Sequence, residues 1–355
     1  MWMVLLSLVG GLVLLTVGGE WLVSGAARLA ARFGVPALVI GLTVVAFGTS
    51  APELMVTLSA AWEGGDAANL ALGNVVGSNI FNVLLILGVC AMLAPLVVNL
   101  SMVRVEIPLM IVASAVALWF GRDGVYSRLE GAILFAALLL YIWFTLTQAR
   151  KASVSQDAPA DEHGPLWRQL LSILGGLVLL VLGARWLVSG AVAVAELLGL
   201  SETIIGLTIV AAGTSLPEVA ASVMATLRNE RDIAVGNIVG SNLFNILAVL
   251  GGASLIAPHG IAAPASIIAF DGPVMLAVAV ACLPIFFTGY RIDRWEGTVF
   301  FGYYIAYVAY LVLDASGHAA LPLYSQAMLY FVVPLTVLTL LVSLWRVMHR
   351  RAGPA

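Results

Sequence analysis

The chain has 355 residues, of which 62% are hydrophobic and only 10% charged, and its mean hydropathy is +1.07. A soluble domain carries about 25% charged residues, so a water-facing surface cannot be built from this composition and lipid must cover most of the exterior. The formal net charge of −3 gives no indication of nucleic-acid binding.

Hydrophobic stretches long enough to cross a bilayer, about 20 apolar residues each, recur along the whole chain. Eleven spans are predicted, at residues 4–31, 37–61, 68–94, 104–121, 128–148, 167–196, 202–226, 232–257, 266–288, 296–314 and 323–347. The first and sixth are long enough to tilt. Cys90 and Cys282 lie inside these spans and are interpreted as small hydrophobic residues rather than a disulfide or metal pair.

The basic residues alternate between the two sides of the predicted spans. If the N-terminus is outside, most of the arginines in the connections fall inside, whereas Arg122 and Arg128 fall clearly outside. The positive-inside rule therefore predicts an outer N-terminus and a cytoplasmic C-terminus. Residues 149–166 form a polar cytoplasmic linker that is too short to be a regulatory domain.

The two halves of the sequence repeat each other at an offset of about 165 residues. Gly41–Ser50 matches Gly206–Ser215, and Gly73–Asn82 matches Gly236–Asn245. Each repeat holds five spans, so the second copy enters the membrane from the opposite side and the repeats are inverted. We predict a first five-helix repeat at 1–148, the linker at 149–166, a second repeat at 167–314, and an extra transmembrane helix with a basic tail at 315–355.

The strongest motif is Gly-Thr-Ser-x-Pro-Glu, which occurs at 48–53 and again at 213–218 in the middle of apolar spans. Glycine ends one half-helix, Thr or Ser can cap the next, and proline leaves upstream carbonyl groups without helical partners. In lipid such groups, and a buried glutamate, persist only when protein, water or an ion satisfies them. A bound cation does so; the alternative is a kink with a protonated, hydrogen-bonded glutamate.

A second polar set follows in the next span of each repeat. Ser78 and Asn82 lie four residues apart on one helix face, as do Ser241 and Asn245. Hydroxyl and amide oxygens are hard neutral ligands that suit Ca²⁺ or Na⁺. Hydrogen bonding between helices is the alternative. The neighbouring asparagines at 79 and 242 are one position off this face and are assigned to packing.

Charged residues elsewhere in the spans give weaker signals. Glu20 and Arg185 occupy equivalent positions in spans one and six and either pair or extend to an interface. Glu106 and Asp271 precede prolines near span starts and are interpreted as interfacial charges at helix entries.

These repeated motifs resemble the alpha-repeats of the calcium/cation antiporter superfamily, most closely its prokaryotic sodium/calcium exchangers, over about residues 1–314. The resemblance implies an all-α membrane fold of two inverted five-helix repeats, here with one extra C-terminal transmembrane helix. It also implies that spans one and six slide over a fixed core. The implied ion ligands are Thr49, Ser50, Glu53, Ser78, Asn82, Thr214, Ser215, Glu218, Ser241 and Asn245, with backbone carbonyls near Ala46 and Ala211.

The chain departs from the family pattern at one ligand position. Potassium-dependent relatives and some prokaryotic exchangers carry aspartate where this chain has Asn245, which argues against potassium co-transport and removes a protonatable group. The large cytoplasmic calcium-sensing domains of animal exchangers are also missing. We expect an integral inner-membrane protein that functions as a monomer, without a cofactor and without nucleic acid.

The leading hypothesis is exchange of Ca²⁺ for Na⁺ by alternating access, with the two glutamates supplying two negative charges at mid-depth. An alternative on the same fold couples Ca²⁺ or another cation to H⁺, because a buried carboxyl group can itself carry a proton. A passive channel has no need for inverted repeats. An intramembrane enzyme would need a nucleophile or a metal triad beside the glutamates, and the sequence offers neither.

Overall fold

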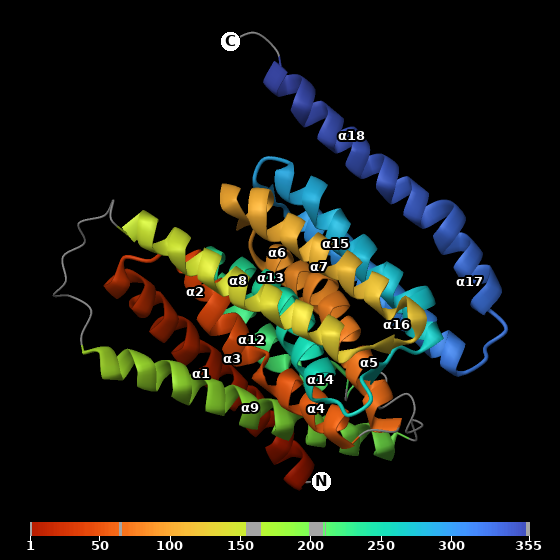
Figure 1. Ribbon diagram of the computed structural model, residues 1–355, viewed down its shortest axis with the longest axis horizontal. Coiled ribbons are helices and arrows are strands. Elements are labelled where there is room, and N and C mark those ends of the chain that lie inside the picture. The colour runs from red at the N-terminus through yellow and green to blue at the C-terminus, as the bar shows by residue number, and fades with distance from the viewer. Residues whose placement is uncertain (1, 64–65, 154–164, 199–208, 210, 353–355) are drawn as a thin grey trace.

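The computed structural model describes residues 2–63, 66–153, 165–198, 209 and 211–352. Nearly all of these residues are helical, and the helices run in one bundle (Figure 1). Among the described residues, nine helices are long and apolar enough to cross a membrane, and one further span is broken into two bent halves. The prediction of an all-α membrane protein is confirmed.

The elements of the first half follow the predicted spans closely. They are α1 (Trp2–Phe33), α2 (Ala37–Ile40), η1 (Gly41–Val45), α3 (Ala46–Thr49), α4 (Ala51–Glu63), α5 (Asp66–Phe81), η2 (Asn82–Leu87), α6 (Gly88–Leu93), β1 (Leu96–Val97), η3 (Met102–Glu106), α7 (Ile107–Phe120), η4 (Gly121–Asp123), β2 (Val125–Tyr126) and α8 (Arg128–Ser153). Here η1, η2 and η3 are π-helical turns, whereas η4 is a short 3₁₀ turn.

The second half repeats this order. Its elements are α9 (Leu166–Leu197), α11 (Ala211–Gly213), α12 (Leu216–Leu227), α13 (Arg231–Phe244), η6 (Asn245–Leu250), α14 (Gly251–Ile256), β3 (Ile261–Ala262), η7 (Ile267–Asp271), α15 (Gly272–Phe287), β4 (Arg291–Ile292) and α16 (Arg294–Ala315), followed by α17 (Leu321–Ala327), η8 (Met328–Val332) and α18 (Val333–Ala352). The start of the predicted seventh span, at 202–208 and 210, lies outside the described residues.

The second span of the first half is broken within its Gly-Thr-Ser-x-Pro-Glu motif. The segment Ala37–Thr49 meets the segment Ala51–Trp62 at 46°. Pro52 explains the break, because its ring cannot donate a backbone hydrogen bond and clashes with the preceding turn. The bend leaves Ser50 at the junction and Glu53 in the first turn of α4, so the two polar side chains sit where the backbone changes direction.

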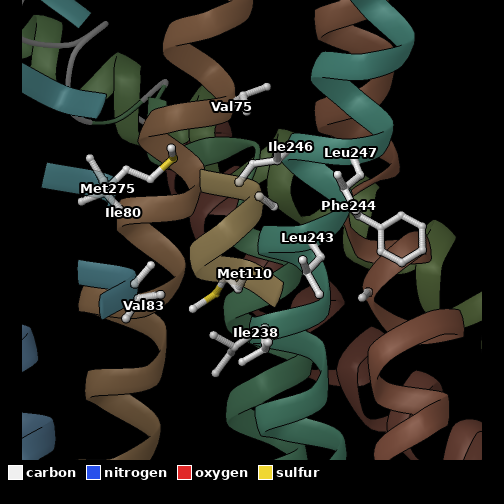
Figure 2. Packing of buried hydrophobic residues seen from close by; sticks show 14 of the residues in the cluster. Val75, Ile80, Val83, Met110, Ile238, Leu243, Phe244, Ile246, Leu247 and Met275 are labelled. Carbon is white, nitrogen blue, oxygen red and sulfur yellow. The ribbon is translucent and has the colours of Figure 1, made fainter. Parts of the chain in front are cut away.

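Two helices, α5 and α13, form the centre of the bundle. Every residue is buried in the most apolar window of the span 231–256, and most are buried in that of the span 71–93. Figure 2 shows apolar side chains of both helices together, with Met110 of α7 and Met275 of α15 among them. Because α5 and α13 are packed within this core, the polar side chains that they carry have fixed positions.

The two longest helices, α1 and α9, pack against each other at the edge of the bundle. Figure 1 shows them side by side. Glycines allow their backbones to touch. A Cβ atom added at Gly176 would lie 2.6 Å from the backbone nitrogen of Leu22, and one added at Gly11 would lie 2.7 Å from that of Leu187. Small residues at contacts of this kind are typical of helix pairs in membranes.

Short strands join the connections of the two halves. Leu96 of β1 pairs with Ile292 of β4, and Val125 of β2 pairs with Ala262 of β3, both in antiparallel register. Each pair therefore ties a loop of the first half to a loop of the second.

The predicted eleventh span is confirmed as α17, η8 and α18. It lies along the edge of α15 and α16, apart from the rest of the bundle (Figure 1). None of its described side chains within 321–343 is buried. Its polar contacts with α16 include the hydroxyl of Tyr303, which lies 2.6 Å from the hydroxyl of Thr336, and the hydroxyl of Tyr324, which donates to the carbonyl of Ala306 at 2.7 Å.

Candidate ion-binding site

The two broken helices place their polar motifs against each other across the two halves. Ser50 Oγ donates to Glu218 Oε1 at 3.0 Å, and Ser215 Oγ donates to Glu53 Oε1 at 3.0 Å. Each glutamate is thus held by the serine of the opposite half, and both glutamates are 1% exposed. The crossed pairs bring the two carboxyl groups, distant by 165 residues in sequence, to one buried locus.

The second polar set reaches the same locus through Ser78. Ser215 Oγ also lies 3.1 Å from Ser78 Oγ, so α5 contacts the same serine as Glu53 does. The other predicted ligands, on the α5–η2 and α13–η6 segments, are also buried. We call the following eight side chains the oxygen cluster: Ser50, Glu53, Ser78, Asn82, Ser215, Glu218, Ser241 and Asn245.

Five buried oxygens of this cluster have no hydrogen-bond partner among the described residues. They are Glu53 Oε2, Glu218 Oε2, Asn82 Oδ1, Asn245 Oδ1 and Ser241 Oγ. A buried oxygen without a partner is costly, so five of them in one set of side chains favour an additional bound group. Hard oxygens of mixed charge are what Ca²⁺ and Na⁺ bind, and the donor set fits such an ion.

The side chains of the oxygen cluster are carboxylates, hydroxyls and amides, without His or Cys. Within the described residues, no three His, Cys, Asp or Glu side chains gather closely enough to hold a metal together. Two carboxylates with neutral oxygens would balance one divalent cation by charge while leaving the remaining coordination to neutral groups.

The threonines of the motif are held by two asparagines that the sequence interpretation missed. Thr49 Oγ1 donates to Asn237 Oδ1 at 3.0 Å, and Thr214 Oγ1 lies 3.4 Å from Asn74 Oδ1. The amide nitrogen of Asn74 donates to Thr57 at 3.0 Å, and that of Asn237 to a serine of α12 at 2.9 Å. A spacing of four residues to Ser78 and Ser241 was the signal that could have found them.

Ser215 stands at the N-cap of α12, where a capping side chain was possible, but its side chain makes no capping bond and instead contacts Glu53 and Ser78. The carbonyl of Ala46 accepts the backbone N–H of Ser50 at 3.0 Å. Ala211 begins α11, and the structure does not describe its surroundings.

The charged residues outside the cluster also differ from the sequence interpretation. Glu106 is buried rather than interfacial, and Asp271 accepts a hydrogen bond from the hydroxyl of Tyr307 at 2.7 Å. Glu20 of α1 forms an ion pair with Arg228 at the end of α12. The ion pair joins α1 to the end of α12.

Comparison with known proteins gives a family match over both halves. A family model described as sodium/calcium exchanger protein matches residues 3–147 and 168–313. These two ranges leave out the polar linker and the eleventh span.

Individual relatives agree with this match. The sodium/calcium exchanger MaX1 of Methanosarcina acetivorans is 32% identical over 86% of this chain and 97% of its own length. The inner membrane protein YrbG of Escherichia coli is 39% identical over 71% of this chain and 79% of its own. A solved structure of the sodium-calcium exchanger NCX_Mj superposes with a TM-score of 0.75 at 31% identity, covering 87% of this chain and 99% of that one.

Proposed function

The chain belongs to the sodium/calcium exchanger protein family, and on that premise we propose that it exchanges Ca²⁺ for Na⁺ across the membrane by alternating access. It is an integral membrane protein and a cation antiporter on the exchanger fold, not an enzyme. The finer assignment concerns the coupling ion and the residues that hold the ions.

The observation that carries the proposal is the set of unpartnered buried oxygens around the crossed Ser–Glu pairs. One Ca²⁺ between Glu53 and Glu218 would neutralise both carboxylates, and Na⁺ ions would use the same oxygens in its place. Because the two kinds of ion compete for these atoms, occupancy by one excludes the other, which is the requirement for exchange. Ser50, Ser215 and the side chains of α5 and α13 complete the proposed coordination.

The positions of the elements support the proposed alternation of access. The cluster sits among buried helices of both halves, whereas α1 and α9 cover the bundle from outside and meet through glycine backbones. We place the N-terminus outside on the charge distribution of the connections, and we propose that a single chain forms a complete transport unit.

The test is radiolabelled Ca²⁺ uptake into proteoliposomes under two gradients applied separately. An outward Na⁺ gradient should drive uptake, and a pH gradient without Na⁺ should not. Liposomes containing the Glu53→Gln variant serve as the control for leak. Uptake that responds to the pH gradient alone would replace Na⁺ by H⁺ as the coupling ion, and flux that ignores both gradients would remove the antiport mechanism.

A further inference from the structure

Four asparagines join the α5–η2 segment to the α13–η6 segment in two crossed pairs. Asn82 Nδ2 donates to Asn242 Oδ1 at 3.1 Å, and Asn245 Nδ2 donates to Asn79 Oδ1 at 3.1 Å. All four residues are buried. Each pair contains one member of the oxygen cluster and one asparagine that the sequence had assigned to packing.

Asn79 and Asn242 also contact the fourth span of the opposite half, through a methionine in each case. Asn79 Nδ2 lies 3.6 Å from Met275 Sδ and 3.4 Å from the backbone carbonyl of Asn242, and Asn242 Nδ2 lies 3.4 Å from Met110 Sδ. Thioether sulfur and carbonyl oxygen accept hydrogen bonds but donate none. An amide turned the other way would put oxygen against these acceptors, so the side-chain oxygens of Asn79 and Asn242 must face Asn245 and Asn82.

This fixed direction of Asn79 and Asn242 determines how the amides of Asn82 and Asn245 are oriented. With their amide nitrogens bonded to Asn79 and Asn242, the side chains of Asn82 and Asn245 turn their oxygens away from those partners. Both oxygens are buried and have no hydrogen-bond partner among the described residues. Without Asn79 and Asn242, the amide of Asn82 or Asn245 could rotate. It would then present an N–H group, which repels a cation, in place of the oxygen.

We propose that Asn79 and Asn242 are positioning residues for the ion site: each holds the amide of the opposite half's ligand so that its oxygen faces the cation. This inference rests on the proposed function, since it assigns the task of orienting two of the proposed ligands. It gives the site neutral ligands of fixed direction without adding negative charge to that of Glu53 and Glu218.

The experiment measures the half-saturating Ca²⁺ concentration for uptake and, separately, for thermal stabilisation of the detergent-solubilised protein. Asn79→Leu removes the acceptor at similar volume, and we expect half-saturation to rise about tenfold, the effect of one lost hydrogen bond of about 1.4 kcal/mol, with little change in the maximal rate. Asn242→Leu removes the matching acceptor in the other half, the oxygen that receives the amide of Asn82, and should raise half-saturation to a similar extent.

A coupling measurement separates positioning from general packing. In an Asn245→Ala background, Asn79→Leu should raise half-saturation no further, because its effect acts through Asn245. An additive effect, or an unchanged half-saturation in Asn79→Leu alone, would overturn the inference. Where the Asn245→Ala variant binds no Ca²⁺, or where Asn79→Leu does not fold, an unchanged half-saturation in Asn242→Leu would overturn it. Wild-type protein that neither binds nor transports Ca²⁺ would instead refute the proposed function.

Discussion

A single methyl group added at Gly176 tests whether close contact between α1 and α9 is required for transport. The Cβ atom of an alanine there would lie 2.6 Å from the backbone nitrogen of Leu22 and 2.7 Å from the carbonyl oxygen of Gly18. Both atoms belong to the backbone of α1, so no side chain can turn away to make room. The helices must separate instead.

The size of the effect follows from these distances. Ordinary contact begins near 3.4 Å, so the backbones must move apart by about 0.8 Å at this point. Overpacking of this kind costs about 1–3 kcal/mol, because neighbouring groups are forced from their packed positions. We expect Gly176→Ala to lower the unfolding temperature in detergent and to slow Ca²⁺ exchange by about tenfold or more, on the scale of about 1.4 kcal/mol for each factor of ten.

The neighbouring glycine provides a matched control in the same helix. A Cβ atom at Gly175 would lie 3.2 Å from the ring of Trp21, a side chain that is 49% exposed and can turn outward. The unfolding temperature and the rate of Ca²⁺ exchange should therefore remain close to wild type in Gly175→Ala. Equal losses in the two variants, or none in Gly176→Ala, would refute the claim that backbone contact between α1 and α9 limits the motion.

Three further expectations follow from the site and its surroundings. Glu53→Gln and, separately, Glu218→Gln should each lower Ca²⁺ uptake by about 100-fold or more, since a charge facing a dication in a poorly polarisable site contributes several kcal/mol; uptake near wild type in variants that reach the membrane would contradict the assignment. The half-exposed Glu20–Arg228 pair should contribute only about 0.5 kcal/mol to stability, so Glu20→Gln should leave the unfolding temperature in detergent nearly unchanged, and a fall of many degrees would disprove this. Removal of residues 321–355 should leave Na⁺-driven uptake intact, whereas loss of uptake from a well-folded product would assign the eleventh span a part in transport.

Most of the architecture could be predicted because hydropathy and an internal repeat are one-dimensional signals. The described helices lie where apolar stretches of the sequence lie, and the eleventh predicted span became the peripheral α17–η8–α18. The pairing of Glu53 with Glu218 at one locus could also be foreseen, since equivalent positions in two repeats reach equivalent depths.

The orientation of individual polar side chains could not be predicted in the same way. Successive helix positions are about 100° apart, which is why Asn79 seemed to face away from the face of Ser78 and Asn82. With α13 against α5, that direction points to Asn245 of the opposite half. The sequence motif allowed a Thr or Ser to cap the next half-helix, but the side chain of Ser215 turns to Glu53 and Ser78 instead. Such choices depend on the partner helix, which the sequence pattern does not contain.

The two strand pairs, β1 with β4 and β2 with β3, have a mechanical consequence for the whole molecule. Each pair is antiparallel and ties together turns that lead into different helices of the two halves. Helices whose connecting loops are paired in this way are held together at their ends, and we expect α5–α8 and α13–α16 to move as a single frame. Under the proposed alternating access, the displacement that exposes the oxygen cluster would then come from segments without strand pairs, namely α1, α9 and the half-helices beside them.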